Sequence, residues 1–392
     1  MKKKILFVND EMTMGGVARI LNTFLKMIDR DRYDVDLLVL HKRGELLDEI
    51  PSDINVIEGS KFFSCIDRPL SECKGKELFY KLRLLFYMKT GLIKNKIVSE
   101  RKKILNKHYD IEFSAKEGFC TIFTGYGDSN LKVNWVQVDY KESNYSSHHM
   151  GLVKDALTHI DMNIACSNQV KESYQELFGV NRICVVHNLV DEDRIRNMSL
   201  EPCDLKLDDK KINIITVARF HPQKAVDRLI RAYSKLKDYY NLIIIGDGGL
   251  KEELYNLAKE LNCFDDISWL GLKSNPYPYV RRCDLFVMSS LYEGYPTMTV
   301  ESLISDTPVL TTLVAGVSEQ IDDSNGWIVE NSEDGLFNKL DEIKNDKANL
   351  LELKKDLENY HYDNESILNR YYERCNYYWS WFCGCYRCEC VS

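Results

Sequence analysis

The sequence lacks long hydrophobic runs and has little proline and glycine. Its 392 residues include 8 prolines and 20 glycines, which argues against collagen-like or linker-rich architecture. No stretch approaches the roughly 18 consecutive apolar residues of a transmembrane helix. The apolar run near the start, at residues 5–8, is also far shorter than the about 7–15 residues of a secretory signal. We therefore expect an intracellular protein whose first apolar run is a buried strand.

Several signatures of other protein classes are missing as well. No G-x-G-x-x-G follows an apolar run, which disfavours a nicotinamide or flavin enzyme. The pattern G-x-x-x-x-G-K-[ST] is also missing, which disfavours a P-loop ATPase. The net charge of −8 makes general nucleic-acid binding a poor interpretation.

Thirteen cysteines are present, but they do not suggest the disulfide framework of a small secreted protein. Eight are scattered singly, and we expect them to be reduced thiols. The other five crowd the last 18 residues, and four of them lie close together as Cys383, Cys385, Cys388 and Cys390. A tetrahedral metal cage from ligands so close in sequence would be strained, so we favour a disordered end or an aromatic patch on a membrane.

Short apolar runs alternate with helical patterns along the chain. Strands are expected at 4–8, 35–40, 54–57, 111–114, 133–138, 163–166, 183–186, 212–218, 242–245, 267–269, 285–288, 309–312 and 327–329. Helices are expected at 17–28, 76–106, 168–178, 225–237, 250–261, 276–281, 297–304 and about 334–378. This alternation predicts an α/β protein with doubly wound parallel sheets.

The pattern restarts after the polar segment 191–210, which predicts two Rossmann-like domains in series. We place them at 1–195 and 196–365. Residues 366–392 are expected to form a final helix that crosses back to the first domain, followed by a tail rich in cysteine and aromatic residues. In such folds ligands bind at the carboxyl ends of the strands, so we expect the two domains to face each other across a ligand-binding cleft.

The strongest chemical motif is SSLYEGYPTMTVESL at 289–303. Gly294 shapes a turn before a helix whose first turn contains Thr297 and Met298, and free N–H groups there suit an anion. Glu301 lies about one turn further on, where a carboxylate can accept hydrogen bonds from a ribose. A capped helix with two acidic surface residues, Glu293 and Glu301, is the plainer alternative.

Two further loops follow expected strands. In VARFHPQKAVDR (217–228), Arg219 and Lys224 stand at a strand end and suit a diphosphate, although a solvated basic loop is equally possible. In NDEMTMGGVAR (9–19), Gly15 and Gly16 let the backbone approach a ligand, although a plain turn is equally possible.

Together, VARF..QK, IIIGDGG, WLG and EGYPTMTVESL, in this order, resemble glycosyltransferase family 4, the group 1 transferases of bacterial surface-polysaccharide type. The resemblance covers roughly residues 1–365. It implies the GT-B fold and a retaining transfer from a nucleoside diphosphate sugar, with UDP favoured. It also implies that no metal is required. Three Asp-x-Asp pairs, at 29/31, 34/36 and 191/193, are interpreted as solvated turn and strand-edge residues.

The resemblance also implies roles for individual residues. Arg219 and Lys224 would neutralise the leaving diphosphate, and Glu293 would bind donor-sugar hydroxyls. The backbone at Thr297 and Met298 would bind the distal phosphate, and Glu301 would bind the ribose. Gly271 would lie beside the base, and Gly294 would shape the turn before the helix. Gly15 and Gly16 would lie over the phosphates.

One position departs from the family pattern. In NWVQVDY (134–140), many relatives carry His where this chain has Gln137. Glutamine cannot carry a proton at neutral pH, so Asp139 becomes the better polar candidate and joins Glu293, Arg219 and Lys224 as a proposed catalytic residue.

Residues 74–107 hold eleven Lys or Arg against two Glu, interleaved with apolar and aromatic residues. This pattern fits one or two basic amphipathic helices, either at an anionic membrane surface or packed on the first domain. Because many family members use lipid-linked acceptors, the resemblance favours the membrane.

We therefore expect a glycosyltransferase at the inner face of the cell membrane, acting on a glycan or a lipid-linked glycan. Two alternatives stay open. One is a sugar-nucleotide 2-epimerase of similar architecture, and the other is a non-catalytic donor-binding partner of another transferase.

Overall fold

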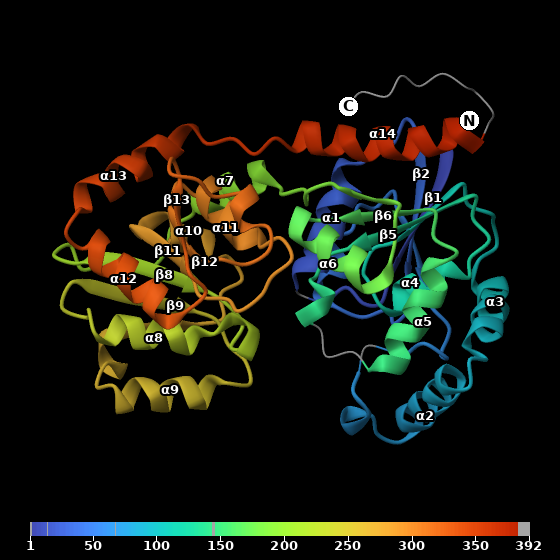
Figure 1. The fold of residues 1–392 in the computed structure, drawn as a ribbon, viewed down its shortest axis with the longest axis horizontal. Coiled ribbons are helices and arrows are strands. Elements are labelled where there is room, and N and C mark those ends of the chain that lie inside the picture. The colour runs from blue at the N-terminus through green and yellow to red at the C-terminus, as the bar shows by residue number, and fades with distance from the viewer. Residues whose placement is uncertain (1, 14, 67, 143–145, 383–392) are drawn as a thin grey trace. The chain divides into compact units, whose positions relative to one another are not determined.

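The computed structural model describes residues 2–13, 15–66, 68–142 and 146–382 of the chain. It consists of two compact units, Met1–Leu189 with Asn364–Ser392, and Val190–Asp363 (Figure 1). The boundary expected between residues 195 and 196 falls inside a helix that belongs to the second unit. The four tail cysteines named above lie outside the described residues.

The first unit is built on a seven-stranded parallel sheet with the order β3-β2-β1-β4-β5-β6-β7. Its strands are β1 (Lys3–Asn9), β2 (Tyr33–Val39), β3 (Asn55–Glu58), β4 (Ile111–Ser114), β5 (Leu131–Val136), β6 (Met162–Ala165) and β7 (Ile183–Val185). The sequence predicted each of them to within about two residues. The apolar side chains of the five central strands are buried, as expected for a parallel sheet that is covered on both faces, whereas those of the edge strands β3 and β7 are half-buried.

The helices of the first unit are α1 (Gly16–Met27), α2 (Lys76–Lys89), α3 (Ile93–Ile104), α4 (Phe119–Gly125), α5 (Ser147–Leu157), α6 (Asn168–Phe178) and α14 (Asn364–Phe382). Two of them, α4 and α5, were not predicted. Every residue of α4 is buried, so its sequence has no polar face to reveal a helical period. The stretch 76–106, where one or two helices were expected, forms two, α2 and α3.

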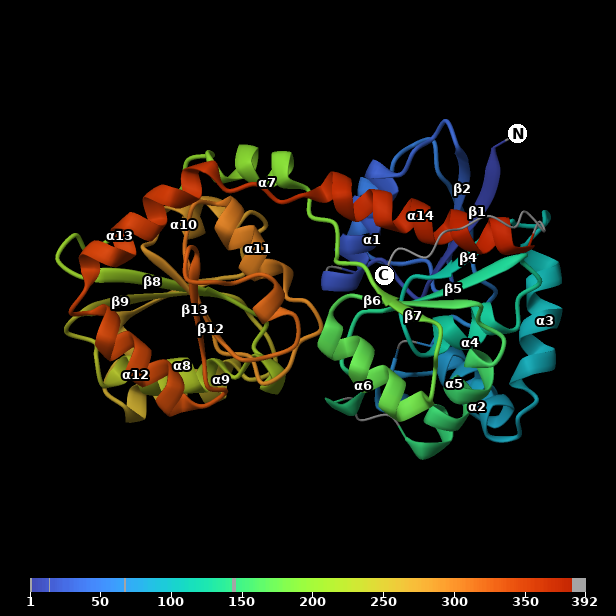
Figure 2. The same ribbon diagram turned by 45° about the horizontal axis from the view of Figure 1, so that its top comes forward.

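The last helix, α14, lies along the first unit (Figures 1 and 2). Tyr371 packs its ring edge-on against Phe24 of α1, at 5.0 Å between centroids, and against Trp135 of β5, at 5.5 Å. The Tyr372 hydroxyl accepts a hydrogen bond from the Asp29 N–H at 2.7 Å. Helix α14 therefore completes the aromatic core of the first unit.

The second unit is built on a six-stranded parallel sheet with the order β10-β9-β8-β11-β12-β13. Its strands are β8 (Ile212–Val217), β9 (Tyr240–Ile245), β10 (Ile267–Gly271), β11 (Leu285–Met288), β12 (Val309–Thr312) and β13 (Gly326–Val329). Its helices are α7 (Glu192–Ser199), α8 (Val226–Ser234), α9 (Lys251–Glu260), α10 (Tyr277–Arg282), α11 (Thr297–Ile304), α12 (Glu333–Ile343) and α13 (Lys347–Asp356). The stretch expected to be helical at 334–378 is thus divided among α12, α13 and α14.

Helices cover both faces of this second sheet, with α8, α9 and α12 on one face and α10 and α11 on the other (Figures 1 and 2). Neighbouring strand residues alternate between two cores. Ile214 joins the core beneath α8, and Ile215 joins the core beneath α10 and α11. The prediction of two doubly wound α/β units is therefore confirmed.

The strand order places one switch point in each sheet. In the first sheet, β1 to β3 follow one another toward one edge and β4 to β7 toward the other edge. In the second sheet, β8 to β10 and β11 to β13 are divided in the same way. Open α/β sheets bind ligands at the carboxyl ends of the strands at such points. The loops after β1, β4, β8 and β11 are therefore the first places to look for chemistry.

Candidate active site

At the second switch point, the loops after β8 and β11 are tied to each other. The Leu291 N–H donates to the Gln223 carbonyl at 2.8 Å, and the Ser289 hydroxyl donates to the Lys224 carbonyl at 2.9 Å. These bonds bring together the two motifs that the sequence analysis singled out, although they are far apart in the chain.

Lys224 and Glu293 form an ion pair between these loops. The Lys224 ammonium lies 2.5 Å from Glu293 Oε1. Gln223 steadies the same carboxylate region, because its Nε2 donates to the Tyr292 carbonyl at 2.9 Å and reaches Glu293 Oε2 at 3.5 Å. The sequence analysis gave Lys224 and Glu293 separate roles, with diphosphate and sugar, and did not anticipate that they pair with each other.

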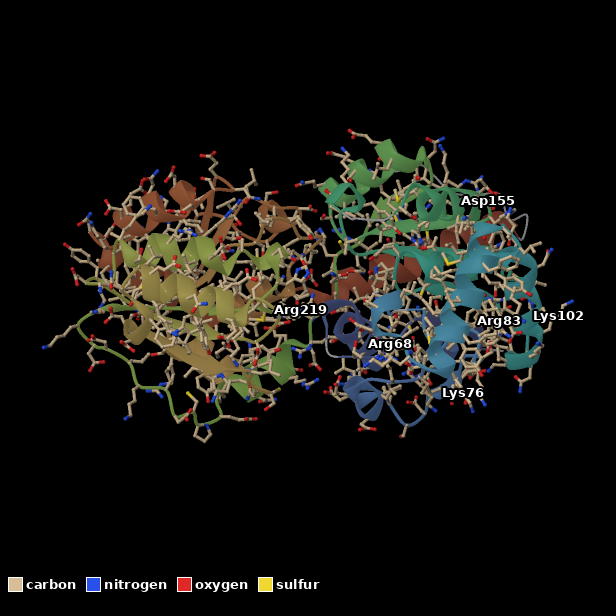
Figure 3. All side chains as sticks on the ribbon, turned by 90° about the horizontal axis from the view of Figure 1, so that it is seen from below. Arg68, Lys76, Arg83, Lys102, Asp155 and Arg219 are labelled. Atoms are coloured by element: carbon tan, nitrogen blue, oxygen red, sulfur yellow. The ribbon has the colours of Figure 1, made fainter. Side chains whose placement is uncertain are left out.

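Arg219 differs from Lys224, because its side chain is exposed (Figure 3). Its guanidinium has no hydrogen-bond or ion-pair partner within the described part of the chain. The backbone of this loop is nevertheless fixed, since the His221 N–H donates to the Arg219 carbonyl at 2.8 Å. The loop thus presents one paired and one unpaired cation at the end of β8, a combination that suits a dianionic group.

Helix α11 begins at Thr297 directly after Pro296, and no side chain caps it. Its first turn therefore offers backbone N–H groups of Thr297 and Met298 at the positive end of the helix dipole. The turn before α11, at Gly294, packs closely against Gly316 in the loop that follows the neighbouring strand β12. A Cβ at Gly316, whose φ is +82°, would lie 2.8 Å from the Gly294 carbonyl oxygen. Gly316 is a supporting residue that the sequence analysis missed.

Glu301 is buried one turn into α11. The hydroxyl of Tyr277, at the start of α10, donates to Glu301 Oε2 at 3.1 Å. This bond holds one carboxylate oxygen in a defined direction, and the role of Glu301 at a ribose stays a prediction. Tyr277 was not predicted, because nothing in its local sequence marks it as a partner of α11.

Gly271 ends β10, beside the expected position of the base. Its carbonyl accepts a hydrogen bond from the Gly246 N–H at 3.0 Å. The neighbouring Leu272 is 79% exposed, and Trp269 packs its ring against Tyr255 at 4.6 Å. The end of β10 therefore offers an apolar surface next to a fixed backbone, which is compatible with a flat aromatic ligand.

In the first unit, α1 begins at Gly16, and Gly15 precedes it without a side-chain cap. A Cβ added at Gly16 would meet no described atom within 4 Å, and one at Gly15 would meet only the Thr13 carbonyl oxygen at 3.9 Å. The glycines are therefore not required by packing within the described chain. They leave the backbone at the end of β1 accessible to a ligand.

Asp139 is engaged within its own unit. Its Oδ1 accepts a hydrogen bond from the Lys141 N–H at 3.0 Å and another from the Ser173 hydroxyl. These bonds tie the short helical turn Tyr140–Glu142 to α6. The Asp139 carboxylate therefore has a structural function in the first unit. Its role in catalysis stays a prediction.

Gln137 follows β5, and its side-chain amide is buried without a hydrogen-bond partner among the described residues. Its main-chain N–H donates to Oε2 of Glu117 at 3.0 Å. Glu117 follows β4, and burial raises the pKa of its carboxyl group. The sequence analysis did not single out Glu117, although polar residues directly after a strand at a switch point were the signal that could have identified it.

Within the described residues, no cluster of three or more His, Cys, Asp or Glu is arranged to hold a metal ion. One interpretation of the Asp-x-Asp pairs needs correction. Asp36 was expected to be solvated, but it is buried, accepts a hydrogen bond from the Tyr109 hydroxyl at 2.6 Å and pairs with Lys107 at 3.1 Å.

The basic stretch 74–107 divides into two helices with different surroundings. In α3, Ile93 and Ile97 are fully buried in the first unit. Arg101 is also buried and forms two bonds to Glu112, at 2.8 and 2.7 Å. Arg101 is therefore a structural residue and is not available to a membrane surface. Lys102, which follows it in α3, is exposed (Figure 3).

Helix α2, by contrast, presents an exposed apolar face, which consists of Leu78, Phe79, Leu82, Leu85 and Phe86. The spacing i, i+1, i+4, i+7, i+8 places these residues on one side of the helix. Figure 3 shows Lys76 and Arg83 on the same helix.

Comparisons with known proteins show which proteins this chain is similar to. Residues 200–364 match the family model described as glycosyl transferases group 1. The chain is 28% identical over 337 residues to N-acetylgalactosamine-N,N'-diacetylbacillosaminyl-diphospho-undecaprenol 4-alpha-N-acetylgalactosaminyltransferase of Campylobacter jejuni, covering 83% of this chain and 86% of that protein. It is 36% identical over 139 residues to the O-antigen biosynthesis glycosyltransferase WbnH of Escherichia coli, covering 36% of this chain and 39% of that protein.

Solved structures show the same fold at low sequence identity. Anabaena Alr3699/HepE in complex with UDP superposes with a TM-score of 0.72 at 16% identity, over 95% of this chain and all of that one. A mutant of S. aureus TarM in complex with UDP, α-GlcNAc-glycerol and fondaparinux superposes with a TM-score of 0.67 at 16% identity, over 95% of this chain and all of that one. With its two Rossmann-like units, this chain has the GT-B fold, and residues 200–364 of its second unit match the group 1 glycosyl transferases.

Proposed function

We propose that this transferase moves a sugar from a nucleoside diphosphate sugar, with UDP as the favoured nucleotide, to a glycan or lipid-linked glycan acceptor in surface-polysaccharide synthesis. The names of the relatives support this proposal, because one refers to a diphospho-undecaprenol acceptor and another to O-antigen biosynthesis. The UDP in two similar structures supports the choice of nucleotide.

The observation that carries the proposal is the pairing of Lys224 with Glu293 between the two loops of the second switch point. A cation is needed for the leaving diphosphate, and a carboxylate is needed for donor-sugar hydroxyls. The pair positions both groups in one place before the donor binds. When a diphosphate reaches Lys224, it would compete with Glu293 for the ammonium and leave the carboxylate free to accept sugar hydroxyls.

Three groups of the second unit would stabilise the leaving diphosphate: Arg219, Lys224 and the N–H groups at the start of α11. Fixed cations and dipoles aimed at developing charge are an effective means of catalysis. Front-face transfer with retention asks mainly for this stabilisation and for orientation of the acceptor. We therefore propose a retaining reaction in which these groups replace a metal ion, so that EDTA should not inhibit transfer.

We further propose that the enzyme works peripherally at the inner face of the cell membrane. No described helix combines the length and hydropathy that a membrane span needs. The support comes from α2, whose exposed face carries two aromatic residues, Phe79 at 62% and Phe86 at 58% exposure. Exposed apolar side chains beside lysine and arginine are the pattern of a helix that lies in an anionic lipid interface.

A transfer assay tests the function directly. The protein is incubated with UDP-sugars and a panel of polyprenyl-diphosphate-linked glycans, with and without EDTA, and both UDP release and glycosylated lipid are measured. The proposal expects UDP release that depends on the acceptor. A donor that is isomerised without any acceptor would support the epimerase instead, and donor binding without turnover would support the non-catalytic partner.

A further inference from the structure

The chain connects the two units at two places, and the two connections are joined within the second unit. The chain enters this unit at Val190 and leaves it after Asp363. Helix α7 follows the entry, and residues 360–363, which we call the return segment, precede the exit. Figures 1 and 2 show the return segment beside α7. Glu192 of α7 joins them, because its Oε2 accepts a hydrogen bond from the Tyr362 N–H at 3.1 Å.

The return segment also reaches the turn before α11. The Tyr362 hydroxyl lies 3.1 Å from the Tyr295 hydroxyl, so that one of the two donates a hydrogen bond to the other. Both side chains are buried. Tyr295 lies between Gly294 and Pro296, the residue after which α11 begins. The bond therefore connects the return segment to the start of the helix whose first N–H groups are the candidate phosphate contacts.

The return segment is also fixed to the end of α11. Arg196 of α7 donates from Nη1 to the carbonyl of Ile304, the last residue of α11, at 3.4 Å. Its Nη2 donates to the Tyr360 carbonyl in the return segment, and its Nε donates to Glu192 Oε1 at 3.0 Å. One guanidinium thus joins α7, the return segment and α11. The return segment is therefore bound to the start of α11 through Tyr362 and to the end of α11 through Arg196.

The turn before α11 is in close contact on another side as well. A Cβ at Gly316, in the loop after β12, would lie 2.9 Å from the Tyr295 Cα. The start of α11 is thus placed by this loop and by the bond from Tyr362. Groups that bind a substrate lose their effect steeply when they are displaced, since a shift of 1 Å can cost about 100-fold in rate. A hydroxyl that fixes the turn should therefore affect binding at the first N–H groups of α11.

We propose that Tyr362 is a positioning residue for the donor. Through Tyr295 it holds the start of α11 where the helix N–H groups reach the distal phosphate of a nucleoside diphosphate. This inference rests on the proposed function, because it takes the start of α11 as the element that binds this phosphate. It predicts that the Tyr362 hydroxyl contributes to binding of the distal phosphate and contributes nothing to binding of the rest of the nucleotide.

The test compares UDP with UMP, which lacks the distal phosphate. Isothermal titration measures the Kd of each nucleotide for wild type and for Tyr362→Phe in the full chain. Wild type should bind UDP more tightly than UMP. In Tyr362→Phe this preference should shrink by about ten-fold, the equivalent of one hydrogen bond, because UDP binds more weakly and UMP binds as before. A residue that only stabilises the fold would leave the preference unchanged.

The Tyr295 hydroxyl allows a second measurement. Because the two hydroxyls bond to each other, Tyr295→Phe should reduce the preference for UDP as Tyr362→Phe does. The double variant should reduce it no further than either single variant. Losses that add up in the double variant would show that the two hydroxyls act separately, and would overturn the inference that Tyr362 acts through Tyr295.

Tyr233→Phe is the matched control. Tyr233 of α8 is also buried in the second unit, and its hydroxyl donates to the Asp266 carbonyl at 3.0 Å. This variant should unfold at a lower temperature than wild type and keep the wild-type preference for UDP. An equal loss of preference in Tyr233→Phe and Tyr362→Phe would show general destabilisation and overturn the inference.

An unchanged preference for UDP in Tyr362→Phe would also overturn this inference and leave the proposed function intact. If wild type binds UDP no more tightly than UMP, the proposed binding of the distal phosphate at α11 fails, and this inference fails with it.

Discussion

The Lys224 ammonium lies 2.5 Å from a Glu293 carboxylate oxygen, across two loops that follow neighbouring strands of the second sheet. Each residue thereby holds the other in place. Under the proposed function, donor binding would be an exchange, in which the diphosphate replaces Glu293 as the partner of Lys224. Substituting either residue should therefore affect more than one contact to the donor.

Lys224→Ala should lower sugar transfer by at least about 100-fold, because a fixed group that stabilises developing charge is typically worth that much. The measurement is kcat/KM for the donor at saturating acceptor. Lys235→Ala is the control, since Lys235 forms an exposed ion pair with Glu333 at 2.8 Å in the same unit. Equal loss in both variants would show that general destabilisation, and not the site, is responsible.

Glu301→Ala should remove the preference of the protein for a nucleotide with ribose over one with 2′-deoxyribose. Wild type should bind UDP about ten-fold more tightly than 2′-deoxy-UDP, because the carboxylate accepts a bond from the 2′-hydroxyl. The variant should bind both nucleotides equally weakly, as measured by isothermal titration. A preserved preference for UDP in Glu301→Ala would remove Glu301 from the ribose site.

Most of the fold, and the loops that form the candidate site, could be predicted because their signals are local in sequence. Apolar strands, the uncapped start of α11 and the paired loops at 217–228 and 289–303 all have readable patterns. Three features could not be predicted because they depend on tertiary contacts. The Lys224–Glu293 pair, the Tyr277 bond to Glu301 and the burial of Arg101 against Glu112 each join segments whose proximity only the folded chain determines.

Glu100 should make the stability of the first unit depend on pH in the acid range. Burial disfavours its charge, but bonds from Lys103 at 2.8 Å and Lys96 at 2.6 Å outweigh burial and lower the pKa to about 2. Because the pKa in the folded state lies below the ordinary value of 4.5, this stabilisation is present above about pH 5 and is lost as pH falls towards 2.

Glu100→Gln should therefore lower the free energy of unfolding by about 2 kcal/mol at pH 7 and by much less near pH 2. Urea denaturation across this range measures the difference. Glu77→Gln, which removes an exposed pair with Arg68, should change stability by less than about 1 kcal/mol at either pH. A constant difference between Glu100→Gln and wild type at all pH values would contradict the account.

Replacing the two aromatic residues of the exposed α2 face should weaken membrane binding. The double variant Phe79→Ser, Phe86→Ser should co-sediment several-fold less with vesicles that contain anionic lipid, since it loses buried apolar area and keeps every charge. Leu351→Ser, at an exposed position of α13, is the control and should bind like wild type. Equal sedimentation of all three proteins would remove the membrane proposal without affecting the donor site.

The most direct test of the central claim is a binding panel of UDP-, GDP-, ADP- and CMP-sugars in EDTA, followed by thermal unfolding of wild type and Lys224→Ala. A ligand at about 100 times its Kd adds roughly 2.7 kcal/mol of stability. The account predicts that UDP-sugars alone raise the unfolding temperature of wild type, by several degrees, and that Lys224→Ala loses most of this rise. No rise with any nucleotide sugar, or an undiminished rise in Lys224→Ala, would contradict it.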